Sequence, residues 1–151
     1  MIFYQWLLLL HIFSAIVWMG AGITLVLLAW RAKRLGEELE MIDQMEWIGS
    51  RVGGPAVIIS LGTGLWMVVG TNLWQFSQAW VVGGLIILIL LFLVGVGFHL
   101  PQYKRIRAAS EEYGKDSLVV QQLIRRSFAA AQIEVALLVI VIFLMVFKPG
   151  I

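Results

Sequence analysis

Residues 79–100, AWVVGGLIILILLFLVGVGFHL, decide the fold because this stretch contains no Asp, Glu, Lys or Arg. A helix needs about 20 mostly apolar residues to cross the hydrocarbon core of a bilayer, so the stretch is predicted to span a membrane. Three similar blocks occur elsewhere, separated by segments that hold most of the charge. We therefore predict an all-α protein, an antiparallel four-helix transmembrane bundle that forms a single domain over residues 1–151. The predicted spans are about residues 2–30, 52–70, 79–100 and 127–147.

The composition supports a membrane protein and excludes several other classes. Of the 151 residues, 61% are hydrophobic, whereas a soluble domain is about half apolar. The chain has no cysteine, which excludes disulfides, iron–sulfur clusters and thiolate metal sites. The net charge is +2, but the basic residues flank the apolar blocks and form no single patch. No nucleic-acid partner is therefore expected, and the expected surroundings are a lipid bilayer.

The basic residues are distributed unequally between the two ends of the predicted bundle. Ten of the eleven Lys and Arg residues lie in the connections between spans one and two or between spans three and four. Positively charged connections stay in the cytoplasm, so we expect both termini outside the cytoplasm and the protein in the inner (plasma) membrane of the cell. Aromatic side chains that suit a membrane interface mark the outer ends of the spans. These are Tyr4, Trp6, Trp74 and Trp80.

Helical extensions are expected on the cytoplasmic side. The fourth helix should begin near residues 116–117, well before its span, and its first turns should project into the cytoplasm. Residues 35–48 are amphipathic. They could lie on the membrane surface, extend the first span, or belong to a helical hairpin that links spans one and two. We expect residues 53–55 (GGP) to separate this helix from the second span and Pro101 to end the third span, since proline interrupts helices.

One face of the first span carries the leading candidate site. His11 is predicted to lie about 12 Å inside the membrane, where a polar side chain usually faces the bundle interior. Ala15, Trp18 and Gly22 follow on the same helical face, and we expect all four to line a cavity in the outer half. Imidazole is a common ligand of haem and metals; the alternative is a histidine that only hydrogen-bonds a neighbouring helix. A backbone carbonyl or Thr63 of span two is the expected partner of its second ring nitrogen.

Two methionines add possible ligands to this site. Met67 and Met145 lie near the outer ends of spans two and four, and thioethers ligate Cu(I) or the iron of a His–Met haem. Both sulfurs differ from His11 by about 7 Å in depth. A large flat cofactor such as haem b bridges that offset more easily than copper does. Methionine is also an ordinary core residue, so both side chains could simply fill space.

A second candidate site lies toward the cytoplasmic side. Glu134 is the only carboxylate within a span, about 10 Å from the cytoplasmic edge, where a carboxylate is expected to be neutral or paired. Arg51 and His99 are within vertical reach of it. The three residues predict either a proton or cation site or a structural ion pair. His11 and His99 differ by about 28 Å in depth, so they cannot ligate one haem iron between them.

Several spaced motifs extend over the whole chain. They are His11-x3-Ala15-x2-Trp18-x-Gly20-x-Gly22, residues 31–34 (RAKR), 51–55 (RVGGP), 62–66 (GTGLW) and the ending 145–150 (MVFKPG). Together they resemble a family of small bacterial four-span membrane proteins that is known only as a domain of unknown function. The resemblance implies the fold and the number of spans, and it implies no activity.

The first span alone is also similar to the opening helix of two other families, the membrane-bound protoporphyrinogen oxidases and the copper-resistance D-type proteins. In the oxidase-like family a histidine of this kind is implicated in haem binding, which the resemblance transfers to His11 only. After Gly22 the chain has ITLV at residues 23–26 in place of that family's aromatic–Leu-Pro-Arg stretch. The resemblance therefore does not extend to oxidase activity.

Three functional hypotheses remain open. The leading one is a small membrane cofactor protein that binds haem b, or less favourably copper, through His11. The second is a non-catalytic packing partner, either in a homodimer or in a larger membrane complex. The third is a small transporter that uses Glu134. The sequence contains no nucleotide-binding loop, HExxH helix or nucleophile elbow, so no enzyme class is indicated.

Overall fold

The computed structural model describes residues 2–71 and 74–149, and this part of the chain is helical without any strand. Four continuous helical rods in it are long and apolar enough to cross a membrane. They confirm the all-α class and the four membrane-spanning helices. The elements are α1 (Ile2–Leu35); α2 (Glu38–Ile48), η1 (Gly49–Gly53) and α3 (Gly54–Val69); α4 (Ala79–Val94), η2 (Gly95–His99) and α5 (Leu100–Tyr113); and α6 (Leu118–Phe147).

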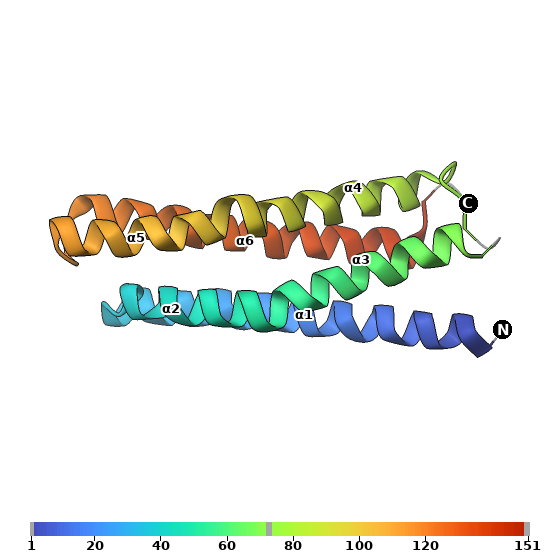
Figure 1. Cartoon of the computed structure of the whole chain (residues 1–151), viewed down its shortest axis with the longest axis horizontal. Helices are drawn as coiled ribbons and strands as arrows, with labels where there is room; N and C mark the ends of the chain where they lie inside the picture. Colours follow the sequence, from blue (N-terminus) through green and yellow to red (C-terminus); the bar gives the residue numbers. More distant parts are fainter. Residues whose placement is uncertain (1, 72–73, 150–151) are drawn as a thin grey trace.

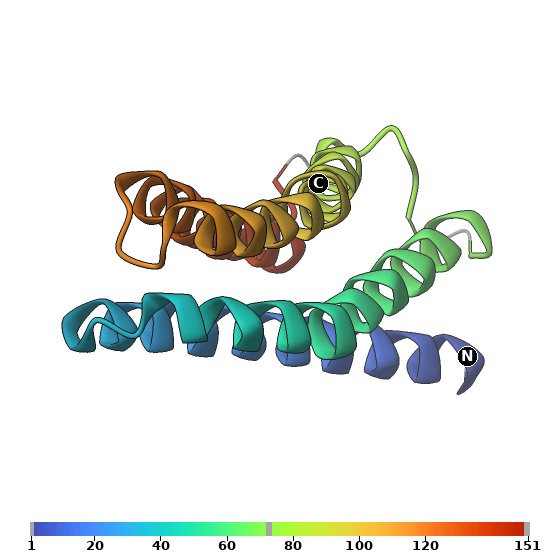
Figure 2. The same ribbon diagram turned by 60° about the vertical axis from the view of Figure 1, so that its left-hand side comes forward.

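The rods form two antiparallel hairpins, one of α1 with α2–η1–α3 and one of α4–η2–α5 with α6 (Figure 1). Both hairpin turns lie at one end of the bundle, and the two chain ends lie at the other (Figure 1). Figure 2 shows the hairpins as two layers, with α3 leaving α1 and rising toward α4. The turns need a left-handed backbone, which glycine provides at Gly36 (φ 73°) and Gly114 (φ 85°). The antiparallel four-helix bundle is thus confirmed.

Both bent rods contain one π-helical turn directly before a proline. The N–H of Gly54 donates to the carbonyl of Gly49, and the N–H of Leu100 donates to the carbonyl of Gly95, five residues back in each case. Proline has no N–H, and its ring clashes with the preceding turn of a regular helix. A wider π turn relieves this clash, so each rod bends at this point without ending.

Two boundaries expected from the sequence are therefore wrong. Residues 53–55 do not separate two helices, and Pro101 does not end one. The helix after Gly36 instead runs back along α1 and continues into α3. For residues 35–48 the hairpin hypothesis is confirmed, whereas a surface helix and an extension of the first span are excluded. The early start of α6 is also confirmed, because the Ser117 side chain accepts a hydrogen bond from the helix's first turn.

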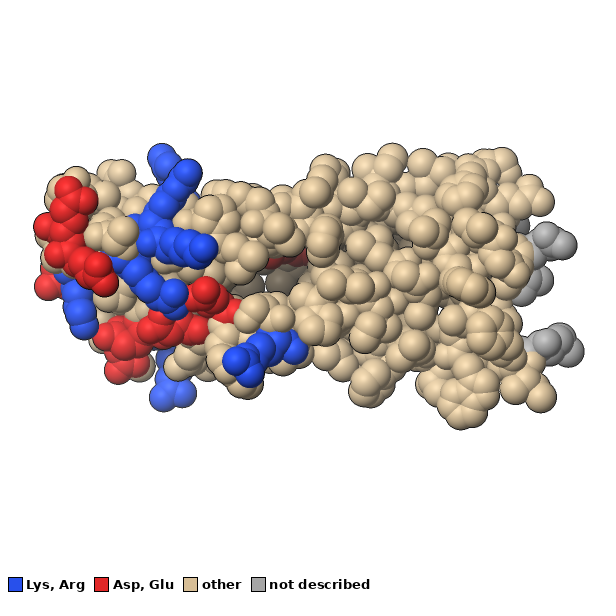
Figure 3. Space-filling view, in the orientation of Figure 1, with Lys and Arg blue, Asp and Glu red and all other residues tan. Residues whose placement is uncertain are grey.

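A cluster of buried hydrophobic residues lies at the end with the hairpin turns, where Figure 3 shows the charged side chains gathered. Ile42 and Ile106 are fully buried there. Arg107 of α5 joins the two hairpins by binding Asp43 (2.7 Å) and Glu46 of α2. We call this region the charged end. Its buried cluster consists of Ala29, Ala32, Met41, Ile42, Met45, Tyr103, Ile106, Ala109, Val120, Ile124, Phe128 and Ala131.

The other part of the bundle has an apolar surface. Large side chains such as Phe13 and Leu93 are more than half exposed, at 63% and 56%, and in a membrane protein such a surface faces lipid. The interior contains hydroxyl groups, including the buried Ser14 and Ser60. One interface prediction is wrong: Trp80 is only 5% exposed. It lies inside the bundle because α4 turns this face toward the other helices.

Candidate functional site

The candidate residues lie around two cavities. The first, which we call the terminal cavity, lies near the chain ends and has a volume of about 290 Å³. The second, the central cavity, lies between the two π turns and has a volume of about 410 Å³. Residues lining the terminal cavity include Tyr4, His11, Met67, Trp80, Met145 and Lys148. Residues lining the central cavity include Trp18, Glu46, Phe92, His99, Tyr103 and Glu134.

His11 of α1 contacts α3 through one of its ring nitrogens. Its Nδ1 lies 3.0 Å from the carbonyl oxygen of Ser60 and 3.1 Å from Oγ1 of Thr63. The Thr63 hydroxyl donates to the carbonyl of Ile59 at 2.6 Å, so both neighbours accept from the imidazole. In the neutral ring the proton is therefore on Nδ1, and Nε2 has the lone pair. Both partners expected from the sequence, a backbone carbonyl and Thr63, are present.

Small side chains bring α1 and α3 close enough for this contact. The hydroxyl groups of Ser14 and Ser60 are hydrogen-bonded at 2.7 Å. A Cβ atom on Gly64 would lie 3.1 Å from Cε1 of His11, so glycine leaves the room that the ring occupies. The ring is thereby held against the wall of the terminal cavity. No described residue bonds to its Nε2.

Met67 and Met145 line the same cavity as His11. Met67 is 6% exposed. The methyl carbon of Met145 packs against α4, where a Cβ on Gly84 would approach it to 2.7 Å. Among the described residues, no group of three or more His, Asp or Glu side chains is placed to hold a metal ion. A metal in the terminal cavity would therefore need the thioethers in addition to His11.

Two further residues of the terminal cavity escaped the sequence reasoning. The indole N–H of Trp80 is buried and has no hydrogen-bond partner in the described part of the chain. Nζ of Lys148 lies 4.0 Å from the ring centroid of Trp74 and also lines the cavity. The signal for Lys148 was its isolation, because it is the one basic residue outside the two charged connections. Trp80 gave no distinct signal, since tryptophan also suits a membrane interface.

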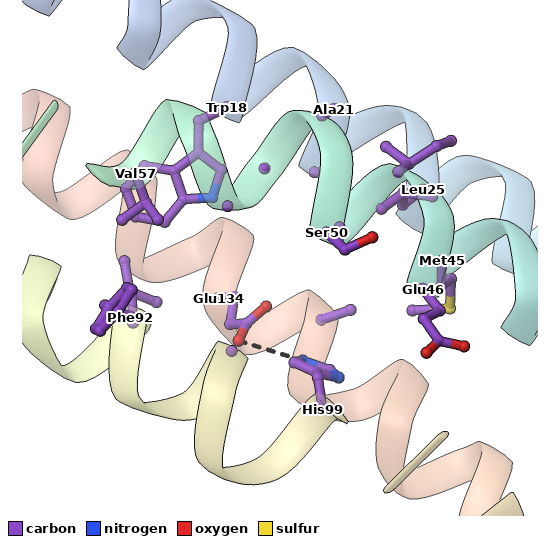
Figure 4. A pocket seen from close by; sticks show the side chains of 18 of the residues that line it. Trp18, Ala21, Leu25, Met45, Glu46, Ser50, Val57, Phe92, His99 and Glu134 are labelled. Atoms are coloured by element: carbon purple, nitrogen blue, oxygen red, sulfur yellow. Dashed lines mark ion pairs between the residues drawn. The ribbon is translucent and has the colours of Figure 1, made fainter. Parts of the chain in front are cut away.

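The central cavity contains the pair formed by Glu134 and His99, whose side chains point toward each other from α6 and η2 (Figure 4). Nε2 of His99 lies 3.2 Å from Oε1 of Glu134, and the two side chains are 9% and 25% exposed. This is an ion-pair distance, but the atoms are not aligned as a hydrogen bond. Both ring nitrogens of His99 are buried without a hydrogen-bond partner among the described residues. The two side chains are therefore close together, but the ring nitrogens of His99 lack hydrogen bonds among the described residues.

The other charged groups near this pair have partners of their own. Glu46, which also lines the central cavity, is bound by Arg107. Arg51 lies with its guanidinium carbon 5.7 Å from the ring centroid of Trp47, and it forms no ion pair with Glu134 in the described structure. The structure thus brings Glu134 and His99 together and leaves Arg51 apart from them.

Trp18 belongs to the central cavity together with Gly22, whereas His11 lines the terminal cavity. The expectation that one face of the first span lines a single outer cavity is therefore wrong. Seven residues of helix correspond to about 10 Å, which is enough to carry one face past two separate cavities. His11 and His99 are likewise in different cavities, so no cofactor is shared between them in this arrangement.

These observations define a class: a helical membrane protein with four spans and two internal cavities, one built around a hydrogen-bonded histidine and one around a carboxylate–histidine pair. Comparison with family models matches residues 5–149 to the family described as "Predicted integral membrane protein (DUF2269)". The chain belongs to this family, which confirms the resemblance to a four-span family of unknown function. Comparisons with curated proteins and with solved structures found no match.

Proposed function

We propose that this membrane protein binds b-type haem in the terminal cavity, with Nε2 of His11 as a ligand of the iron. The observation that carries the proposal is the bonding of Nδ1 to the Ser60 carbonyl and to Thr63. A ligating histidine normally donates its other ring N–H in this way, which fixes the ring and raises the basicity of the ligating nitrogen. His11 is thus oriented with its lone pair available at a largely apolar cavity.

Other residues of the terminal cavity suit the remaining parts of the group. The thioether of Met67 or Met145 would be the candidate second ligand of the iron, since both line the same cavity as His11, and His–Met ligation raises the reduction potential of haem. Lys148 provides a positive charge for a propionate, and Trp80 provides an unused N–H donor. The volume of about 290 Å³ is near the lower limit for ligand pockets, about 300 Å³. The cavity would thus enclose only part of a haem.

The haem would supply one-electron chemistry. The chain's own contribution would be to hold the iron through His11, to neutralise a propionate through Lys148, and to exclude water by its apolar wall. Copper is the second candidate, because an imidazole and two thioethers are ligands that suit Cu(I). Copper binding would require Nε2 of His11 and both methionine sulfurs to lie close enough to bind one ion.

Optical spectroscopy of the purified full chain in detergent tests the proposal. Added haem is expected to give a shifted Soret band that saturates at one haem per chain. His11→Ala should lose the shifted band because it removes the ligating nitrogen. His99→Ala is the matched control, since His99 lines the other cavity, and it should retain the band.

Two results would overturn the haem proposal. One is a Soret band that is unchanged in His11→Ala. The other is wild-type protein that gives no shifted band at all. If that protein binds Cu(I) with an affinity that falls in Met67→Leu and Met145→Leu, copper is the ligand. Protein that binds neither would favour a non-catalytic partner in a homodimer or larger membrane complex.

A further inference from the structure

The Glu134–His99 pair lacks the hydrogen bonds that a structural ion pair normally has. The His99 side chain is 91% buried, being 9% exposed, yet neither ring nitrogen has a hydrogen-bond partner in the described residues. Buried polar groups in native proteins are nearly always hydrogen-bonded, and the exceptions often have a functional reason. Here the unsatisfied nitrogens belong to a residue that lines a cavity of about 410 Å³. The pair therefore borders open space in the cavity and is not enclosed by a network of protein hydrogen bonds.

The protein group that could pair with a charged ligand in this cavity is the carboxylate of Glu134, which is negative when ionised. Glu46 shares the single positive charge of Arg107 with Asp43, so this cluster keeps a net negative charge, and Arg51 lies over Trp47. Among the described residues, His99 is therefore the one group able to carry positive charge beside Glu134. When the pair holds one proton it is neutral overall, and when it holds none it carries a single negative charge. The described residues supply no second cation to this pair.

The walls of the cavity select for a hydrophobic ligand. They are mostly apolar, and they include the aromatic rings of Trp18, Phe92 and Tyr103, with Tyr103 stacked on His99 at 5.6 Å between ring centroids. Aromatic faces attract cations, and the attraction grows when the cation is desolvated. The volume lies within the range of small-molecule sites, about 300–1,000 Å³. Figure 3 shows a hollow in the middle of this face with acidic atoms visible inside it.

The two π turns make the room for this cavity. Gly49 and Gly53 of η1 and Gly95 of η2 all line it, so backbone without side chains forms part of the wall on both sides. π turns inside α-helices are frequently located at functional sites. In this chain the two turns lie in different hairpins and border the same cavity. The bends in the two rods therefore lie at the walls of the cavity beside Glu134.

We propose that the central cavity binds a hydrophobic organic cation, with Glu134 as its counter-ion, in exchange for the proton held by the Glu134–His99 pair. The exchange is balanced: the protonated pair and the free cation give the cation paired with the Glu134 carboxylate, a neutral His99, and one released proton. The titratable groups facing the pair are Tyr103 of α5 and Glu46 of α2, and none is contributed by α1, α3 or α4. This site is independent of haem binding and deepens the hypothesis of a transporter that uses Glu134.

Binding of tetraphenylphosphonium to the purified full chain tests the proposal. Equilibrium dialysis should show saturable binding that falls about tenfold or more in Glu134→Gln, because each 1.4 kcal/mol lost is a factor of ten in affinity. Triphenylphosphine oxide is the uncharged probe, and its weaker binding should not change in this variant. Glu40→Gln is the matched control, since Glu40 is an exposed carboxylate on α2 outside the cavity.

Calorimetry in buffers of different ionisation enthalpy measures the proton. Tetraphenylphosphonium binding, measured at several pH values between about pH 5 and 8, should release up to one proton per cation. His99→Gln should still bind the cation but with less proton release. The absence of proton release from wild type over this range would refute the exchange.

Equal affinity of wild type and a folded Glu134→Gln for tetraphenylphosphonium would refute Glu134 as counter-ion. If Glu134→Gln does not fold, the wild type decides: equal affinity for the charged and the uncharged probe would refute the site. His11→Ala should bind tetraphenylphosphonium as the wild type does, since His11 lines the terminal cavity. If the haem proposal fails, the test of cation binding is unaffected. If cation binding fails, the test of haem binding is unaffected.

Discussion

The two histidines of the chain differ in how their ring nitrogens are bonded. In the terminal cavity, Nδ1 of His11 is held by two acceptors of α3 at 3.0 and 3.1 Å. In the central cavity, His99 has a carboxylate at 3.2 Å but no aligned hydrogen bond within the described residues. A fixed ring with one available lone pair suits a ligand of a metal centre, whereas a loosely satisfied acid–base pair suits proton exchange. The two histidines thus suit different chemistry, metal ligation for His11 and proton exchange for His99.

The first prediction concerns which side of the membrane each cavity approaches, and its effect is all-or-none. Reporter fusions near Ser110, in the last turns of α5, should read cytoplasmic, and a fusion after the last residue should read external, because ten of eleven basic residues lie at the charged end. The terminal cavity would then lie nearer the outer surface and the central cavity nearer the cytoplasm. A cytoplasmic reading at the C-terminus would contradict this orientation.

The second prediction is that a substitution in the core of the charged end affects ligand binding in the central cavity and not in the terminal cavity. Ile106→Ala leaves a void at a position that is fully buried, and it should lower the free energy of unfolding in detergent by about 2–5 kcal/mol. Because Tyr103 belongs to the same cluster and lines the central cavity, tetraphenylphosphonium binding should weaken while the haem spectrum stays.

Ile133→Ala is the control for this experiment, since Ile133 is 61% exposed and faces outward. It should change the unfolding free energy far less than Ile106→Ala does. Equal destabilisation by the two substitutions would show that the core of the charged end is not what supports the bundle.

The third prediction acts on the terminal cavity. Gly64→Leu would force a side chain into the ring of His11, whose Cε1 would be 3.1 Å from the new Cβ. Overpacking of this kind costs about 1–3 kcal/mol, and the displaced ring should lose the shifted Soret band. Gly62→Leu is the control, because a Cβ there meets nothing within 4 Å. Haem binding that survives Gly64→Leu unchanged would mean that the ring position is not what creates the site.

The fourth prediction has the smallest expected effect. Thr63→Val removes one of the two acceptors of Nδ1 and keeps the shape of the side chain. The Ser60 carbonyl remains, so stability should fall by only about 0.5–1.5 kcal/mol and haem affinity by about tenfold or less. Thr24→Val on the exposed face of α1 is the control. An affinity loss as large as that of His11→Ala would show that Thr63 itself holds the ligand.

Much of the architecture could be predicted from local sequence, and the errors have physical causes. The number of spans, the hairpin at residues 35–48 and the start of α6 follow from hydropathy, amphipathic spacing and the absence of a helix breaker within residues 118–147. The helix ends expected near Pro55 and Pro101 failed because a π turn before each proline removes its clash. Trp80 was misplaced because the same residue type favours both membrane interfaces and buried positions.

The candidate sites could be predicted only in part. His11 and Glu134 stood out because polar side chains are rare in apolar spans, and the depth of the methionines matched one end of the bundle. The sequence did not determine which residues contact these two side chains. Arg51 and His99 were both within reach of Glu134 along the membrane normal, but only His99 lies beside it. Depth can be counted along a helix, whereas rotation about its axis depends on packing.

The sequence by itself determined that this chain crosses the membrane four times, which ends of the helices carry charge, and which few residues place chemistry among apolar neighbours. These are properties of continuous segments, and burial of about 20 residues in lipid is decided segment by segment. Only the tertiary structure decided that Trp18 belongs with Glu134, that His11 shares a cavity with both methionines, and that His99 lies beside Glu134. Such contacts join residues far apart in the chain, and they depend on the close packing of small side chains between helices.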